Sequence, residues 1–199
     1  MILSHRHQFI YIKLRKVAGS STEAWLGSIL GPEDVKIGAS GGVAAQNAHL
    51  HPSQNHAPWM YVRDHWPREW DTYFKWCVER NPWDKMVSWY WHSRQLHPDV
   101  EIYSSFKRFC MSNLPASIND WDYYTHNDSI QVDQVVLYHE LYNQIPTLGI
   151  PGWESLKTHQ WLSHSRPEGP YQEYYDVESR LHIQEIYAKP IQKFNFLFD

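Results

Sequence analysis

The sequence predicts a single α/β domain over residues 1–199, built around a central parallel sheet. Two observations favour this fold class: apolar runs of strand length alternate with stretches of helical periodicity, and two of these runs lead through a turn directly into a helix. Hydrophobic residues make up 42% of the chain, which indicates a globular protein. A length of 199 residues is also common for one domain.

The amino-terminal part of the chain predicts one strand, a long loop and short helical segments. We expect the first strand at residues 8–14 and a helix at about 21–30, where a Gly-Pro pair ends it. Residues 38–58 are rich in Gly, Ala, Asn, Gln and His and lack a clear period, so they predict a functional loop. A short helix at 59–65 and a further turn at 67–70 follow.

The second strand is expected at residues 73–79, and a helix that opens with Asn81-Pro82 follows it at once. Proline fits the first helical turn because the N–H that it lacks would have no partner there. Apolar residues at helical spacing support this helix. The remaining elements are expected in this order: a helix at 101–111, a strand at 130–138 that carries Asp133, and a helix at 175–189 that Pro190 ends.

The composition narrows the classes of function. The formal net charge is −4, whereas generic binding of nucleic acids needs a basic surface, so we expect no nucleic-acid partner. Two cysteines give no disulfide framework. No segment reaches the roughly 18 consecutive apolar residues that span a membrane, and the amino terminus lacks the apolar core of a signal peptide. We therefore expect a soluble, cytoplasmic protein.

Two cationic turns are the most informative local features. Arg15 and Lys16 lie between the first strand and its helix, and Arg80 lies between the second strand and the helix after it. The first N–H groups of a helix lack partners within the helix, and its dipole favours negative charge there. Two such corners in one small domain predict a ligand with two separate phosphate-type groups.

Both turns contain recognisable motifs. The first reads Lys16-Val17-Ala18-Gly19-Ser20-Ser21, and the second reads Arg80-Asn81-Pro82-Trp83-Asp84-Lys85-Met86-Val87-Ser88. They resemble the nucleotide-dependent sulfotransferases, in particular carbohydrate sulfotransferases and their compact bacterial and phage relatives. Val17 stands where this family usually has Thr, Lys85 replaces Arg, and Pro190 replaces a common Asp. Further similar stretches are Glu69–Trp76, Tyr174–Arg180, Ile186–Lys189 and Phe194.

The resemblance implies a P-loop-kinase-like topology and transfer of a sulfuryl group from 3′-phosphoadenosine 5′-phosphosulfate (PAPS) to a hydroxyl acceptor. It assigns stabilisation of the leaving group to Lys16, and binding of the 3′-phosphate to Arg80 and Ser88. No metal is needed in this scheme, because fixed cations supply the charge stabilisation. The residues implied to bind the nucleotide are Arg15, Lys16, Ala18, Gly19, Ser20, Ser21, Thr22, Arg80 and Ser88.

The reaction also needs a general base, because the acceptor hydroxyl loses its proton as it attacks sulfur. Histidine suits this task at neutral pH. His49, His51 and His56 all lie in or beside the long loop. The resembled family often has a His a few residues before a short helix, and this resemblance assigns the base to His56, which Ala57-Pro58-Trp59 follows. These three histidines could instead bind a metal, but no nearby Cys or acidic residue completes the set.

Several other residues have competing interpretations. Asp133 and Glu140 could be paired acids for glycosidic chemistry, but orienting a strand and capping a helix are simpler roles for them. Arg166 is a possible second contact to the 3′-phosphate, by analogy. Tyr174 and Tyr175 are expected to pack and so to fix the last helix.

Two rival functions stay open. An ATP-dependent P-loop kinase needs Gly-x-x-x-x-Gly-Lys-Ser/Thr, but here Lys16 precedes the only glycine of the loop. A protein with the same fold could also bind the nucleotide without turnover, and the three departures from the family pattern favour this reading. The acceptor pocket would come from residues 38–70 and the Trp-rich helices, and aromatic residues suit a sugar, a lipid headgroup or a phenol equally. The sequence predicts no oligomeric state.

Overall fold

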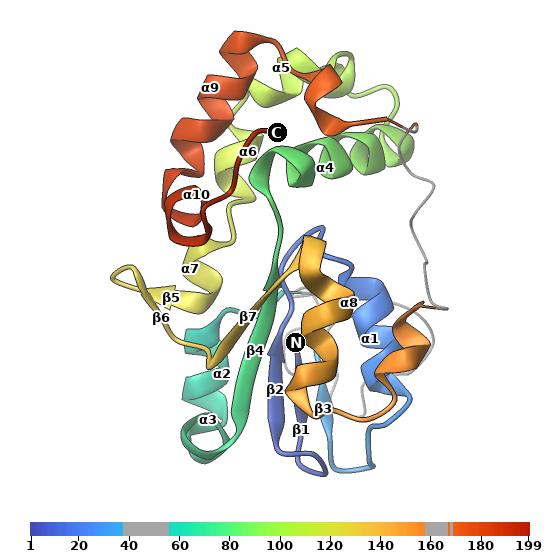
Figure 1. The fold of residues 1–199 in the computed structure, drawn as a ribbon, viewed down its shortest axis with the longest axis vertical. Coiled ribbons are helices and arrows are strands. Elements are labelled where there is room, and N and C mark those ends of the chain that lie inside the picture. The colour runs from blue at the N-terminus through green and yellow to red at the C-terminus, as the bar shows by residue number, and fades with distance from the viewer. Residues whose placement is uncertain (38–55, 158–166, 168) are drawn as a thin grey trace. The chain divides into compact units, whose positions relative to one another are not determined.

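A computed structural model describes residues 1–37, 56–157, 167 and 169–199, which fold into two compact units (Figure 1). The first unit consists of Met1–Glu79 and Asp122–Trp161 and contains the main sheet. The second consists of Arg80–Trp121 and Leu162–Asp199 and is helical. The expectation of one domain over the whole chain stays a prediction.

The main sheet of the first unit has five strands in the order β3-β1-β2-β4-β7. β2, β4 and β7 are parallel, whereas β1 is antiparallel to both β2 and β3. The expected α/β class is confirmed, but the sheet is mixed and not simply parallel. The strands are β1 (Ile2–Ser4), β2 (Phe9–Ile12), β3 (Val35–Lys36), β4 (Phe74–Glu79) and β7 (Gln134–Leu137).

The turn between β1 and β2 explains why the sheet is mixed. Only residues 5–8 separate the two strands, and a parallel pair would need a crossover of a dozen residues or more. The chain therefore returns as a hairpin, with Gln8 at a φ of 54°. The first strand is shorter than the predicted 8–14, because residues 13 and 14 already belong to the loop that follows.

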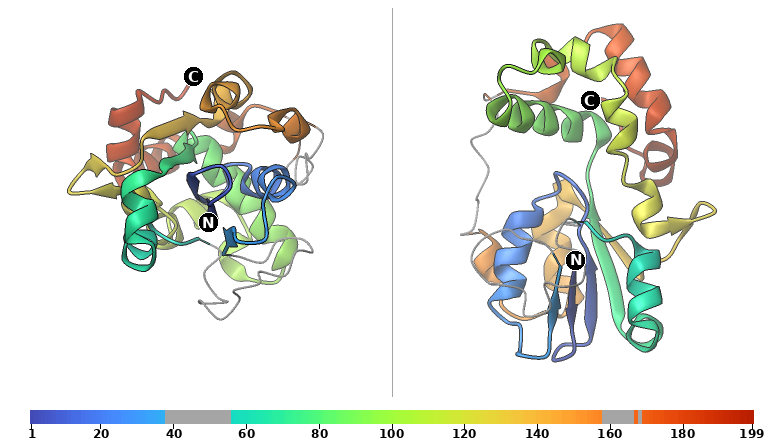
Figure 2. Two further views of the ribbon diagram at one scale, coloured as in Figure 1. Left: turned by 90° about the horizontal axis from the view of Figure 1, so that it is seen from below. Right: turned by 180° about the vertical axis from the view of Figure 1, so that it is seen from behind.

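Helices cover both faces of this sheet (Figures 1 and 2). α1 (Gly19–Gly27) and α8 (Leu141–Gln144) lie on one face, and α2 (Trp59–His65) and α3 (Pro67–Thr72) lie on the other. Under α1, the buried rings of Trp25 and Trp76 have centroids 6.1 Å apart. This apolar contact holds α1 against the sheet, so the loop that precedes α1 has a rigid support.

Short elements complete the first unit. β5 (Thr125–His126) and β6 (Ser129–Ile130) form a small hairpin after α7 (Trp121–Tyr124). The expected strand at 130–138 is therefore divided, and Asp133 precedes β7 and is not part of it. Three 3₁₀ segments follow β7: Tyr138–Glu140, Ile145–Leu148 and Trp153–Lys157.

The second unit is a group of helices around the long helix α4 (Pro82–Leu96). α4 begins as predicted, since Pro82 lies in its first turn and the Asn81 side chain accepts a hydrogen bond from the Trp83 backbone N–H. The other helical segments are Glu101–Tyr103, α5 (Phe106–Cys110), α6 (Leu114–Ser117), Tyr171–Tyr174, α9 (Val177–Ile186) and α10 (Ala188–Phe194).

Two predicted helices of this unit are divided in the structure. The segment at 101–111 breaks because the Ser105 side chain accepts from the Arg108 backbone N–H and starts a new helix there. The segment at 175–189 ends at Ile186, and Pro190 lies inside the next helix, so the prediction that proline ends the helix is wrong. Pro190 is the third residue of α10, where a missing N–H costs nothing. No helix in the described part of the chain is long and apolar enough to cross a membrane.

Asp34 ties the β1–β2 hairpin to the turn that precedes β3. Its carboxylate accepts hydrogen bonds from the Ser4 hydroxyl (2.7 Å) and from the backbone N–H groups of His5 (2.6 Å), Arg6 (3.1 Å) and Gly31 (2.9 Å). Partial burial raises the pKa of Asp34, but the four hydrogen bonds together lower the pKa by a larger amount. The pKa of Asp34 therefore lies below its usual value.

Asp34→Asn is therefore expected to lower the free energy of unfolding by about 2 kcal/mol at pH 7, since the donors lose a charged acceptor. Because the pKa of Asp34 is lowered in the folded state, its ionised carboxylate stabilises the protein at pH values above the unfolded-state pKa of about 4. This contribution is lost as the pH falls from there through the folded-state pKa. Urea denaturation at pH 7 and at pH 3 measures both effects. Asp71→Asn, at an exposed position of α3, is the matched control. Equal stability of the two variants at pH 7 would contradict the prediction.

Candidate functional site

The loop between β2 and α1 has an unusual backbone. Lys16 and Ala18 both adopt left-handed conformations, with φ of 58° and 62°. For residues other than glycine this conformation costs about 1–2 kcal/mol each, and it persists only where surrounding structure enforces it. α1 has no acidic residue in its first turn, and Ala18 provides no side-chain cap. The amino-terminal N–H groups of α1 are thus of the kind that binds anions.

The predicted nucleotide-binding residues of this loop differ in their surroundings. Lys16, Ser20 and Ser21 are half-buried. Arg15 donates from Nη2 to the Tyr123 hydroxyl (2.7 Å), and its Cζ lies 4.6 Å from the centre of that ring. The Thr22 backbone N–H donates to the Ala18 carbonyl (2.9 Å), so this amide belongs to the helix.

The structure brings His56 next to the start of this loop. His56 Nδ1 lies 2.9 Å from the backbone carbonyl oxygen of Lys13. A carbonyl oxygen only accepts hydrogen bonds, so Nδ1 is the nitrogen that carries the proton. In the neutral ring, Nε2 is then the basic nitrogen. His49 and His51, the other candidate bases, lie outside the described residues.

Lys13 is a residue of the site that sequence reasoning missed. Its ammonium group forms a buried ion pair with Glu23 of α1, with Nζ and Oε2 2.7 Å apart. Its side chain also passes over Gly19, where an added Cβ would lie only 2.8 Å from Lys13 Cε. The sequence did contain a signal for this ion pair. Lys13 directly follows an apolar strand, and a second charged residue, Glu23, lies ten positions later on a mostly buried helix face.

In the second unit, Arg80 directly follows β4 and is buried. Its Nε donates to the Asp84 carboxylate (2.6 Å), which fixes the orientation of the guanidinium group. Ser88 lies further along α4 and is half-buried. An oriented guanidinium group suits the oxygens of a phosphate.

Much of the second motif holds the second unit together. The Trp83 indole donates to the Arg180 carbonyl (3.1 Å), and the Tyr175 hydroxyl donates to the Trp83 carbonyl (2.9 Å). Lys85, which replaces the Arg of the resembled family, pairs with Asp120 at 2.7 Å, and both side chains are almost fully buried. These contacts agree with a packing role for Tyr175.

The acids proposed for glycosidic chemistry have structural partners. Asp133 accepts from the Lys75 backbone N–H (2.7 Å) and pairs with the Lys75 ammonium group (3.0 Å). Glu140 is the N-cap residue of α8, but its side chain accepts from Asn143 and not from a backbone N–H. Arg166 lies outside the described residues. Among the residues that the structure describes, no three His, Cys, Asp or Glu side chains are grouped to hold a metal.

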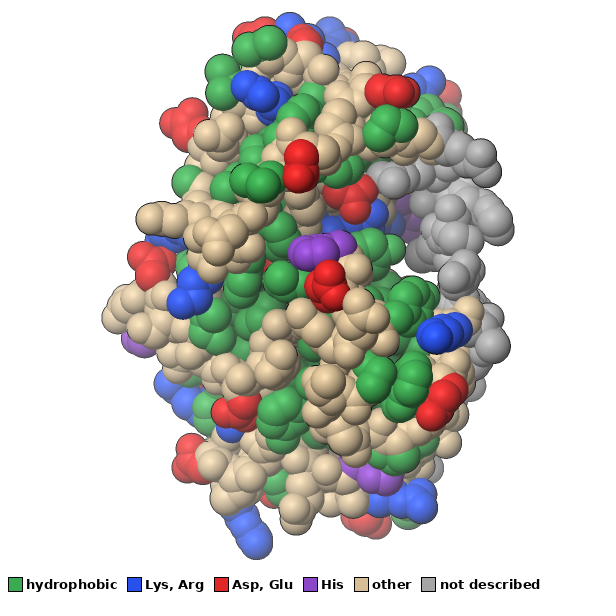
Figure 3. All heavy atoms as spheres, in the orientation of Figure 1, with side chains coloured by type: hydrophobic (Ala, Val, Ile, Leu, Met, Phe, Trp, Pro, Cys, Tyr) green, Lys and Arg blue, Asp and Glu red, His purple; other side chains and the backbone are tan. Residues whose placement is uncertain are grey.

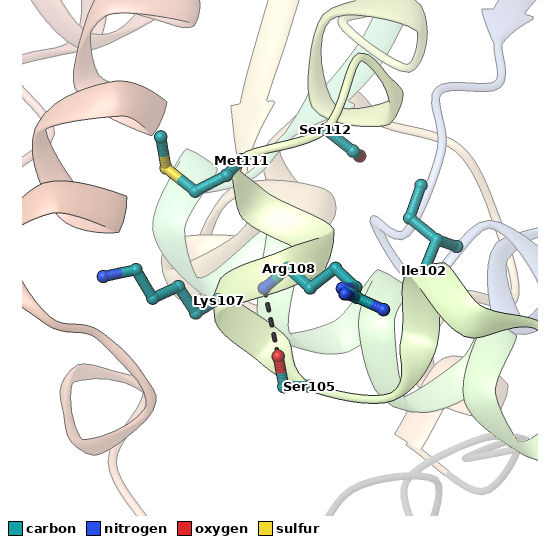
Figure 4. A pocket seen from close by; sticks show the side chains of 6 residues that line it. All are labelled: Ile102, Ser105, Lys107, Arg108, Met111 and Ser112. Carbon is teal, nitrogen blue, oxygen red and sulfur yellow. Dashed lines mark hydrogen bonds between the residues drawn. The ribbon is translucent and has the colours of Figure 1, made fainter.

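The second unit has a pocket whose lining includes none of the predicted site residues. It measures about 520 Å³, and Figure 4 shows the side chains that line it. Its cations already have partners: Lys107 pairs with Asp176 and Glu178 at 2.7 Å each, and Arg108 pairs with Glu101. The pocket is lined by Ile102, Ser105, Lys107, Arg108, Met111 and Ser112.

On the face drawn in Figure 3, basic and acidic side chains of the described residues are interspersed.

The sheet, the left-handed loop before α1 and the histidine beside it define an α/β protein with a candidate anion-binding corner. No protein-family model matches the sequence, and no curated protein matches it.

Proposed function

We propose that this protein is a sulfotransferase that moves a sulfuryl group from PAPS to a hydroxyl acceptor. The acceptor oxygen attacks sulfur in line and gives its proton to His56, the bond from sulfur to the 5′-phosphate oxygen breaks, and adenosine 3′,5′-bisphosphate leaves. The amides of residues 18–21 and the hydroxyls of Ser20 and Ser21 would hold the 5′-phosphate. Lys16 would stabilise the negative charge that builds on the leaving oxygen.

The single observation that carries this proposal is the hydrogen bond between His56 and the Lys13 carbonyl. It joins a histidine with a basic Nε2 to the first residue of the loop that contains Lys16. A base and a cation beside one loop are what attack by a hydroxyl and departure of a phosphate require. The roles of Arg80 and Ser88 at the 3′-phosphate rest on the family resemblance.

A nucleotide-binding protein without turnover is the second candidate. Two features favour it: Val17 is buried and offers no hydroxyl to the loop, and the Arg15 guanidinium group is engaged by Tyr123. An ATP-dependent kinase is third, because the loop lacks the glycine pattern of the P-loop.

Calorimetric titration with adenosine 3′,5′-bisphosphate, followed by an assay with PAPS labelled in its sulfuryl group, separates these candidates. A sulfotransferase is expected to bind the bisphosphate in the titration. In the assay it should transfer the label from PAPS to a hydroxyl acceptor and form adenosine 3′,5′-bisphosphate. Binding without transfer to a broad glycan, phenol and lipid panel would favour the non-catalytic protein. Preference for ATP with magnesium would favour the kinase. Failure to bind the bisphosphate would overturn the proposal.

Ser88→Ala tests the assignment of the 3′-phosphate. Ser88 would donate one hydrogen bond to a charged group, so its loss is expected to weaken binding of adenosine 3′,5′-bisphosphate about tenfold. Binding of adenosine 5′-monophosphate, which lacks the 3′-phosphate, should not change. Equal losses for both nucleotides would place Ser88 away from the 3′-phosphate.

A further inference from the structure

The backbone and the side chain of Lys13 act on different parts of the candidate site. Its carbonyl oxygen accepts the hydrogen bond from His56 Nδ1 (2.9 Å), and its ammonium group pairs with Glu23 of α1 (2.7 Å). One residue thus joins the end of β2, the histidine and the helix. The Lys13 side chain thus links this carbonyl group to α1.

The Lys13 side chain is closely surrounded, both at its ion pair with Glu23 and at Gly19. The Lys13 and Glu23 side chains are only 7% and 1% exposed, so the ion pair lies in a region of low dielectric constant. The Lys13 side chain is also held against the first residue of α1, because Gly19 leaves just enough space for it. Removing the pair would remove one contact that holds the chain where it enters the loop.

We propose that the Lys13–Glu23 ion pair positions the base of the reaction. The pair holds the Lys13 carbonyl in place, and the carbonyl keeps His56 protonated on Nδ1 and basic on Nε2. Lys13 and Glu23 are positioning residues, since they act through His56. The inference rests on the proposed function, but the tautomer of His56 can be measured without any turnover.

The test is a ¹⁵N NMR measurement of the histidine ring nitrogens at a pH where His56 is neutral. The His56→Gln variant identifies the His56 signals among the thirteen histidines. The wild-type protein should show His56 protonated on Nδ1. The double variant Lys13→Met/Glu23→Gln removes both charges together, because a single removal would take the ion-pair partner from a buried charge. We expect a mixture of tautomers in the double variant, together with a tenfold lower kcat and an unchanged KM for PAPS.

The double variant Lys85→Met/Asp120→Asn is the matched control, since it removes a buried ion pair of the same length in the second unit. It should leave the His56 tautomer unchanged. If the first double variant does not fold, Glu23→Asp, which keeps the charge on a shorter side chain, replaces it in the same comparison.

Either of two results would overturn the positioning role: wild-type His56 protonated on Nε2, or a double variant with the wild-type tautomer. A protein that binds no adenosine 3′,5′-bisphosphate would instead contradict the proposed function and leave the tautomer measurement intact. The two failures are therefore distinguishable.

Discussion

Lys16→Met should lower kcat for sulfuryl transfer about 100-fold to 1,000-fold, the usual effect of removing one group that stabilises charge in a transition state. Methionine keeps much of the length of the lysine side chain and removes only its charge. Because the charge is needed most as the bond to the leaving oxygen breaks, kcat should fall more than the affinity for adenosine 3′,5′-bisphosphate. Single-turnover assays with labelled PAPS measure the transfer step directly.

Lys193→Met is the control for this experiment, since Lys193 is an exposed lysine of α10. It should retain wild-type kinetics and binding. A Lys16→Met variant whose kcat equals that of the control would remove Lys16 from the reaction and leave the sulfotransferase proposal without its main cation.

Lys85→Met should destabilise the protein by about 3–5 kcal/mol, because it takes the ammonium group of the ion pair away from the buried Asp120 carboxylate. The Lys85 and Asp120 side chains are 1% and 0% exposed, so water cannot replace the lost ammonium group. The double variant Lys85→Met/Asp120→Asn should recover most of this loss, since it removes both charges. Urea denaturation followed by circular dichroism gives the free energies of unfolding.

The same measurement on Lys85→Arg connects the prediction to the resembled family, which has Arg at this position. Arginine keeps the positive charge, so this variant should be closer to the wild type than Lys85→Met. If the single and double methionine variants were equally destabilised, packing of the Lys85 side chain and not its charge would account for the effect.

The elements that were predicted from the sequence are those with strong local signals. β2 and β4 are short apolar runs, and Asn81 and Pro82 mark the start of α4 through contacts within one helical turn. β1 was missed because its three residues are a strand only through pairing with β2 and β3. Its hairpin also depends on Asp34, which lies about thirty positions away in the sequence.

The candidate site divides in the same way. The sequence indicated Lys16 and His56 as members of one site, and the structure places His56 beside the loop that contains Lys16. The ion pairs Lys13–Glu23 and Lys85–Asp120 were not predicted, because the partners of each pair lie on separate segments that only tertiary packing brings together. The motif that holds Lys85 was interpreted only as a nucleotide motif, although much of it packs the second unit.

Local sequence patterns were sufficient to locate both strand–turn–helix corners, because apolar runs, turn residues and helix starts depend on neighbours within a few positions. The direction of β1, the basic nitrogen of His56 and the partners of the buried lysines were decided by tertiary structure alone. Each depends on hydrogen bonds or ion pairs between residues far apart in the chain, and such contacts exist only after the sheet and helices have packed.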